Sequence, residues 1–444
     1  MEEFSLKLRG ISGGCTESAK LPHPPKEAKI LCMERLLDLM RVIEKMGDAG
    51  SSGALSPRER FFEVAFFGNP DRIPISLWEI RPATLKRWWS EGLPQGLTAS
   101  KFFRFDVFGL NSVNIVSRPS EGFKWEPSDR AINLGPMPPF EYKVLREDER
   151  YRVWVDSLGV TQLGFQEDWR GGWSGFATRT FIDFPVKTRE DFEKVRRRYD
   201  PNTPGRYPPK WSDIAEGLNR RNGAYLVNIT ISGPFWWIRD MMGLEAALIS
   251  IFKDKKLIHD ILELYVSFHS KVLERCLGDV EVDYIILSED MAYKRGPMIS
   301  PRIFRDFFSA VYREITGFFR EHGVKIILVD SDGNIEPLIP DLLAVGVNGV
   351  SPCEVAAGMD VNMLRLKYPR LIMMGGIDKR KIAFSKEDVK SEVDRISKVV
   401  WKKGYFPGVD HAVPPDVSFE NFQYFLDLMK RACGWMNSSL NGNQ

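Results

Sequence analysis

The segment VKIILVDSDGNIEPLIPDLLAVGVNGVSPCEV, residues 324–355, decides the fold class of this chain. It opens with an apolar run that turns acidic only at Asp330 and Asp332, and it returns to a second apolar run that ends at Glu354. Strands that form uninterrupted apolar runs are typical of a parallel sheet covered by helices on its faces. The segment therefore predicts two parallel strands with acidic residues at their carboxyl ends.

The same rhythm continues on both sides of this segment. Helical stretches with apolar residues every three to four positions occupy 245–277 and 300–323. The number of alternating units predicts an α/β protein with a closed (β/α)8 TIM barrel, and an open doubly wound sheet is the alternative. Further apolar strand candidates lie at 224–234, 282–290, 371–378 and 405–411.

Composition along the chain predicts a barrel with additions. Residues 1–55 form an N-terminal extension with one amphipathic helix at 28–46, which is expected to pack on the barrel or against a partner such as a second copy in a homodimer. Residues 56–435 form the barrel. Within it, alternating polar and β-branched or aromatic residues at 140–185 predict a β-hairpin insertion. Residues 436–444 are a C-terminal tail.

Charge and cysteine content favour small-molecule chemistry. The chain has 62 Lys and Arg against 60 Asp and Glu, and it has no basic block of the kind that binds nucleic acid or a membrane surface. Its five cysteines include no CxxC pair, and no signal peptide or apolar membrane span is present. We expect a cytoplasmic protein with a small-molecule substrate.

Polar residues gather where the predicted strands end, which is the edge of a barrel that carries catalytic groups. Asp330 and Asp332 point to the same side because side chains alternate along a strand, so the pair predicts a shared proton, a metal ion or a basic substrate group. A solvated turn is the alternative interpretation. The catalytic candidates are Asp330, Asp332, Glu354 and His411, and the substrate-binding candidates are Arg81, Trp236, Glu289, Asp290 and Lys294.

Several ordered segments resemble the uroporphyrinogen decarboxylase superfamily, which also contains the corrinoid:thiol methyltransferases. They include RERFFEVAFFGNPDRIPI at 58–75, ISGPFWWIRDMMGLEAALISIFKD at 231–254, and VDHAVPPDVSFENFQYF at 409–425. The resemblance extends from about residue 57 to residue 432. It implies a single (β/α)8 barrel with its site at the C-terminal mouth.

The resemblance also implies roles for individual residues. The segment WEIRPATLKRW at 78–88 corresponds to the RQAGRY segment of the decarboxylases and keeps Arg81, whereas FDVFGLNSVNI at 105–115 lacks the catalytic Asp of their FSDI-like segment. Against the HxCG motif of the zinc methyltransferases, Asp330, Asp332 and His411 occupy the metal-ligand positions. Two carboxylates and an imidazole suit zinc or a harder divalent ion.

These matches lead to a methyl-transfer enzyme as the first hypothesis. It would move a methyl group between a small donor, such as a methoxy or methylamine compound, and a corrinoid on a partner protein, with the acids and His411 holding a metal or a proton. The alternative is a cofactor-free decarboxylase of uroporphyrinogen or another polycarboxylate, with Arg81 binding a carboxylate. A further alternative is a non-catalytic protein that binds a cation or an amine.

Overall fold

The computed structural model describes residues 54–77, 79–95, 102–103, 112–119, 122–166 and 179–435. The chain divides into two compact units, Met1–Ala54 and Leu55–Gln444. The predicted helix at 28–46 and the predicted tail at 436–444 lie outside the described residues. The second unit contains the barrel.

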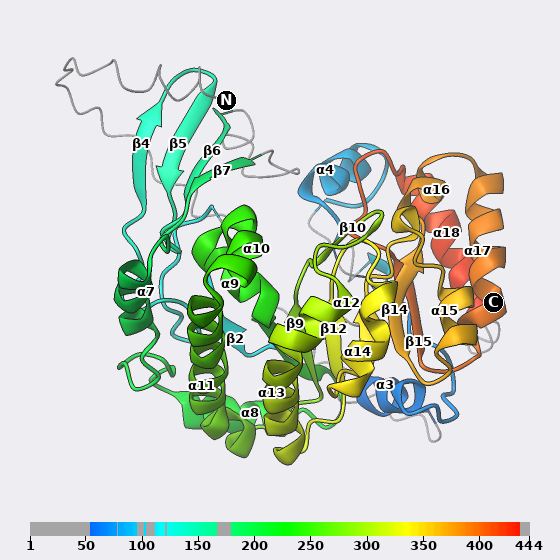
Figure 1. Cartoon of the computed structure of the whole chain (residues 1–444). Coiled ribbons are helices and arrows are strands. Elements are labelled where there is room, and N and C mark those ends of the chain that lie inside the picture. The colour runs from blue at the N-terminus through cyan, green and yellow to red at the C-terminus, as the bar shows by residue number, and fades with distance from the viewer. Residues whose placement is uncertain are drawn as a thin grey trace. The chain divides into compact units, whose positions relative to one another are not determined.

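Seven parallel strands form one sheet and follow one another in chain order. Ser76 forms a parallel bridge with Gly408, and Ile80 forms one with Val413, so an eighth extended segment lies along the last strand. Helices cover the outer side of these strands (Figure 1). The predicted (β/α)8 barrel is confirmed. Its strands are β1 (Ser112–Asn114), β8 (Leu226–Ser232), β9 (Tyr284–Ser288), β12 (Ile327–Asp330), β13 (Gly349–Ser351), β14 (Ile372–Ile377) and β15 (Tyr405–Val409).

The strands are central because their side chains are apolar on both faces. Every residue of β9, β14 and β15 is buried.

No described helix is long and apolar enough to cross a membrane. The helices are α3 (Pro57–Ala65), α4 (Pro82–Ser90), α7 (Arg189–Arg196), α8 (Trp211–Asn219), α9 (Pro234–Met242), α10 (Leu244–Lys253), α11 (Lys255–Asp279), α12 (Pro301–Ile303), α13 (Ser309–Glu321), α14 (Ile339–Ala344), α15 (Val361–Lys367), α16 (Lys379–Ala383), α17 (Lys386–Val400) and α18 (Phe419–Ala432).

The two helical stretches expected from periodicity are each interrupted in the structure. The stretch 245–277 breaks at Asp254, whose carboxylate accepts a hydrogen bond from the Leu257 N–H and so begins α11. The stretch 300–323 contains a π-helical segment, Phe304–Phe308, between α12 and α13. Local capping and a wider turn therefore divide runs whose apolar periodicity is continuous.

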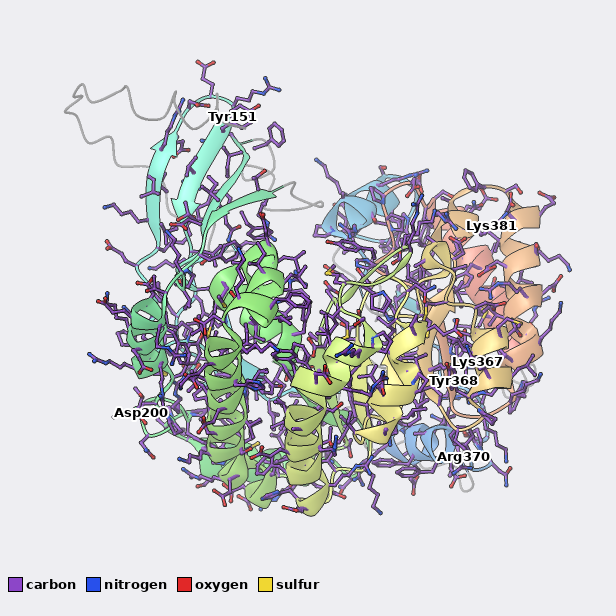
Figure 2. All side chains as sticks on the ribbon, viewed as in Figure 1. Tyr151, Asp200, Lys367, Tyr368, Arg370 and Lys381 are labelled. Carbon is purple, nitrogen blue, oxygen red and sulfur yellow. The ribbon has the colours of Figure 1, made fainter. Side chains whose placement is uncertain are left out.

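The insertion is a four-stranded antiparallel sheet rather than a single hairpin. Its strands, β4 (Lys143–Glu147), β5 (Tyr151–Val155), β6 (Thr161–Phe165) and β7 (Arg179–Asp183), pair in chain order. Tyr151 lies near the far end of this sheet in Figure 2. Two small sheets accompany it: the parallel pair β2 (Val116–Ser117) and β3 (Ile132–Asn133), and the hairpin β10 (Ala292–Tyr293) and β11 (Gly296–Pro297).

A buried ion network closes the amino-terminal end of the barrel. Asp283, which directly precedes β9, is completely buried and accepts the Val227 N–H at 2.7 Å. Its carboxylate pairs with Arg58 at 2.6 Å and with Arg221 at 3.2 Å. Because both arginines satisfy one carboxylate, this buried charge is fully compensated. It connects α3, β8 and β9 at the end of the barrel that is associated with stability.

Candidate active site

The predicted site residues follow the carboxyl ends of the parallel strands. Asp330 is the last residue of β12, and Asp332 follows two positions later. Asp290 follows β9, and Glu354 follows β13. Because these strands are parallel neighbours, their ends meet at one mouth of the barrel.

The surroundings of Asp330 do little to stabilise the negative charge of its ionised carboxylate. Burial raises its pKa to about 7, and the nearby charge of Asp290 acts in the same direction. The Ser351 hydroxyl donates to Oδ1 at 2.8 Å, and the positive charge of Arg118 opposes the rise. Near neutral pH this carboxyl group therefore exists in both protonation states.

Asp332 has the same property but is more open to solvent, with 43% of its side chain exposed. Its pKa is raised to about 7 by burial and by the charges of Asp290, Asp330 and Glu354. The positive charge of Lys379 opposes this rise. Asp332 is thus the acid best placed to exchange a proton with a ligand in the mouth.

Two backbone features fix the acidic turn. The Asp332 N–H donates to Asp290 Oδ1 at 3.1 Å, and the Gly333 N–H donates to Glu354 Oε2 at 2.8 Å. Gly333 has φ +80°, and a Cβ there would lie 2.6 Å from the Ala292 backbone, so only glycine fits. Glu354 therefore holds the turn through its hydrogen bond.

Asp290 itself adopts an unusual backbone conformation. Its φ is +37°, in the left-handed region that costs a non-glycine residue about 1 kcal/mol or more. Burial raises its pKa, and the Arg239 guanidinium donates to its carbonyl oxygen at 2.8 Å. Strained residues of this kind concentrate at functional sites.

His411 contributes a neutral imidazole with a defined tautomer. The Ala412 N–H donates to its Nδ1 at 2.7 Å, so Nδ1 carries no proton and Nε2 carries it in the neutral ring. Nε2 lies 3.5 Å from Asp332 Oδ2. Burial and the charges of Lys379 and Arg81 lower the pKa of His411 to about 4. At neutral pH the ring therefore offers an N–H toward Asp332 rather than a second positive charge.

The predicted substrate-binding residues have different surroundings. Arg81 is 8% exposed, and its charge reaches His411. Lys294 is exposed in the turn between β10 and β11. The Trp236 indole N–H donates to Asp240 at 2.8 Å, and Arg239 lies over the indole ring, 4.6 Å from its centroid.

Glu289 differs from these because it is completely buried. It accepts hydrogen bonds from the Trp236 N–H at 2.9 Å and the Phe235 N–H at 3.4 Å, at the start of α9, and from the Tyr312 hydroxyl. Burial raises its pKa to about 7. In this structure its oxygens hold the first turn of α9.

The proposed metal ligands do not form a ready-made ion site. Within the described residues, no three His, Cys, Asp or Glu side chains are grouped so that they could hold a metal ion. Asp330 receives the Ser351 hydroxyl, while Asp332 lies beside a histidine whose Nε2 carries a proton. The assignment of Asp330, Asp332 and His411 as ligands stays a prediction.

The structure places two cations near the acids that the predicted site residues did not include. Lys379, the first residue of α16, lies 3.1 Å from the buried Asp410 carboxylate. Arg118 follows β2 and donates to Ser232 Oγ at 2.6 Å. In the sequence, Arg118 is distinguished only by its position just after an apolar segment. Its contact with Ser232 is not visible there, because Ser232 is more than a hundred residues away in the chain.

The chain is similar to one protein family and to several solved structures. The sequence profile of the uroporphyrinogen decarboxylase (URO-D) family matches residues 178–432. A methyltransferase from Methanosarcina mazei has 12% sequence identity and a TM-score of 0.51, over 85% of this chain and 99% of that one. A B12-independent methionine synthase from Shewanella sp. W3-18-1, in complex with selenomethionine, has 13% identity and a TM-score of 0.33, over 50% of this chain and 65% of that one. No curated protein matches the sequence.

Proposed function

Because the chain belongs to the uroporphyrinogen decarboxylase family, we propose that it is a barrel enzyme that transfers a methyl group from a small methoxy or methylamine donor to a corrinoid on a partner protein. The observation that carries this proposal is Asp332, a partly exposed carboxyl group with a pKa raised to about 7. Such a group is a general acid at neutral pH. The similarity to a methyltransferase of the same fold makes methyl transfer the first reaction to test.

The proposed chemistry uses Asp332 as the proton donor. When the methyl group leaves the donor's oxygen or nitrogen, that atom gains negative charge and is a poor leaving group unless it receives a proton. Protonated Asp332 supplies this proton and becomes a carboxylate. The His411 Nε2–H, 3.5 Å away, then stabilises the new negative charge. Proton transfer and charge stabilisation thus come from two adjacent side chains.

Asp330 and Glu354 support this acid rather than replace it. The charges of both raise the pKa of Asp332, so each helps to keep it protonated near neutral pH. Glu354 also fixes the turn through the Gly333 N–H. The cluster therefore tunes one exposed proton donor.

The test is methylation of free cob(I)alamin by the purified protein across a panel of methoxy and methylamine compounds. We expect methyl transfer with at least one donor, and its loss in Asp332→Asn. Asp427→Asn, an exposed carboxylate on α18, is the matched control and should keep wild-type activity. If no donor in the panel methylates cob(I)alamin, methyl transfer to a corrinoid is not the function.

Decarboxylation is the second candidate because the mouth also contains cations. The charges of Arg118 and Lys379 act on the acids, and Arg81 acts on His411, so a substrate carboxylate would meet positive charge here. Protonated Asp332 would then supply a proton to the carbon that loses CO2. Anaerobic incubation with uroporphyrinogen tests this directly. Consumption of substrate carboxylates without methyl transfer would replace the first proposal.

A further inference from the structure

A small pocket beside the mouth contains a donor that lacks an acceptor. It lies between the end of β8, the segments around β2 and β3, and helices α9 and α11, with a cavity volume of ≈ 20 Å³. Tyr199 is one of the residues that line the pocket. The next residue in the chain, Asp200, is labelled in Figure 2 and helps to locate this part of the molecule. A volume of roughly 10–15 Å³ is enough for one water-sized group. The pocket thus accepts an end group of a ligand rather than a whole substrate.

Trp237 carries a buried hydrogen-bond donor without a partner. Its side chain lines the pocket and is 95% buried, since only 5% is exposed. Its Nε1–H has no hydrogen-bond partner within the described residues. A buried donor without a partner costs about 1–3 kcal/mol, so such groups are normally satisfied by protein, water or ligand. The indole therefore contributes to the pocket wall a side chain whose Nε1–H has no acceptor among the described residues.

Arg118 supplies positive charge to the same pocket. Its guanidinium donates to Ser232 Oγ at 2.6 Å and forms no ion pair among the described residues. The charge of Arg118 acts on two carboxyl groups, Asp290 and Asp330. Burial raises the pKa of both, and it raises that of Asp330 to about 7, so Asp330 is only partly ionised near neutral pH. The charge of Arg118 is therefore only partly compensated by the protein.

Two further titratable groups of the pocket are His269, which is neutral, and Asp240, which brings a carboxylate to the lining and accepts one hydrogen bond. His269 is 2% exposed, and its Nδ1–H donates to the Tyr265 carbonyl oxygen at 2.8 Å. Burial lowers its pKa to about 4, so the ring is neutral. Asp240 accepts the Trp236 indole N–H at 2.8 Å. Neither residue supplies an acceptor to the indole of Trp237, and the rest of the lining is largely apolar.

We propose that this pocket is a subsite for a carboxylate group, with Arg118 and Trp237 as its specificity-determining residues. A carboxylate oxygen accepts the Trp237 Nε1–H, and the carboxylate charge meets the guanidinium of Arg118. Binding of the carboxylate does not depend on the reaction. The corollary that the methyl donor itself carries this carboxylate rests on the function proposed above.

The test measures binding without turnover. Sodium acetate is titrated into the full-length protein and followed by saturation-transfer NMR, with acetamide as the uncharged analogue and sodium chloride at equal ionic strength. We expect saturable binding of acetate that is tighter than binding of acetamide. Arg118→Met should weaken acetate binding at least about tenfold, and Trp237→Phe by about threefold to tenfold, because each removes one hydrogen bond or charge.

Matched variants separate the pocket from general effects of charge and packing. Arg239→Met removes another cation near Asp290 that does not line the pocket, and it should change acetate binding by less than about twofold. Trp211→Phe, on α8, is the packing control for the buried indole. Circular dichroism establishes that each variant is folded. If Trp237→Phe does not fold, the comparison of acetate binding by Arg118→Met and by Arg239→Met tests the proposal on its own.

Three results would overturn the proposal: no saturable acetate binding, equal affinity for acetate and acetamide, or equal losses in Arg118→Met and Arg239→Met. The first two would leave the pocket to an ordered water molecule. None of them depends on the cob(I)alamin assay, so failure of the subsite and failure of the methyl-transfer proposal are distinguishable.

Discussion

The two ends of this barrel surround the carboxylates Asp283, Asp330 and Asp332 in opposite ways. At the amino-terminal end, Asp283 is completely buried and pairs with two arginines, Arg58 and Arg221. At the mouth, Asp330 and Asp332 have no Lys or Arg within ion-pair distance among the described residues, and the pKa of each is raised to about 7. A carboxylate that is paired with arginines connects the elements that carry the paired residues. A carboxyl group without such a partner lowers the stability of the fold, and its raised pKa keeps it partly protonated near neutral pH. The difference distinguishes an end where a carboxylate forms ion pairs from an end where carboxyl groups have raised pKa values.

The largest expected effect is on turnover at the mouth. Asp332→Asn removes the proposed proton donor but keeps the shape of the side chain. We expect kcat to fall by about 10²–10⁴-fold, the usual contribution of a general acid, while thermal stability is kept. Rates from the reaction identified above, together with thermal melting, measure both quantities. A variant with wild-type kcat would show that the exposed acid is not the proton donor.

The amino-terminal end gives the largest expected effect on stability. Asp283→Asn leaves the buried Arg221 with the exposed Glu281 carboxylate, 3.9 Å away, as its charged partner. Removing one partner of a buried pair costs about 3–5 kcal/mol. Urea denaturation measures the change in the free energy of unfolding. Asp427→Asn, exposed on α18, should change it by less than about 0.5 kcal/mol. If the two variants lose equal stability, the contrast between the barrel ends is wrong.

A smaller effect of opposite sign is expected at Asp330. Its pKa rises from 3.8 to about 7 on folding, so the folded state binds more protons than the unfolded state between these values. Stability from this group is therefore present below about pH 4 and is lost as the pH rises through about 7. The amide introduced by Asp330→Asn does not titrate, and its oxygen can still accept the Ser351 hydroxyl. The stability gain of this variant over wild type should grow between about pH 4 and pH 7, to at most roughly 4 kcal/mol, because one pKa unit corresponds to about 1.4 kcal/mol.

Denaturant midpoints at several pH values measure this gain. The control is Asp427→Asn, because its exposed carboxylate should leave the pH dependence of wild-type stability in place. A constant difference between Asp330→Asn and wild type at all pH values would mean that folding does not change the pKa of the Asp330 carboxyl group.

The sequence predicted the mouth better than the rest of the site. Asp330, Asp332 and Glu354 were found because apolar runs that end in acid mark the carboxyl ends of parallel strands. This signal is local, and strand order in a barrel follows chain order, so the acids had to meet. The (β/α)8 architecture followed from the same repeated pattern.

Contacts between distant segments were not visible in the sequence. Asp283 stands before β9 like any acid before a strand, and Arg58, which pairs with it, lies 225 positions away. The pocket at Trp237 depends on Arg118, which comes from a segment separated from α9 by the whole insertion. From the sequence alone, Trp237 cannot be told from an ordinary packing residue. Only its Nε1–H, which has no hydrogen-bond partner among the described residues, distinguishes it from one. Periodicity reports burial, but it does not report which buried groups lack partners.

The smallest expected effect tests whether Lys379 couples the two halves of the acid cluster. Lys379 pairs with Asp410 at 3.1 Å, and its charge lowers the pKa values of both Asp332 and His411. Lys379→Met should therefore raise the pKa of His411 from about 4 toward its ordinary value of 6.5 without reaching it, because burial, the larger cause of the lowering, remains. NMR titration of the His411 ring measures this shift, with buried His269 as the internal reference. An unchanged pKa of His411 would mean that water screens Lys379 from the mouth, and that burial alone keeps the imidazole neutral beside Asp332.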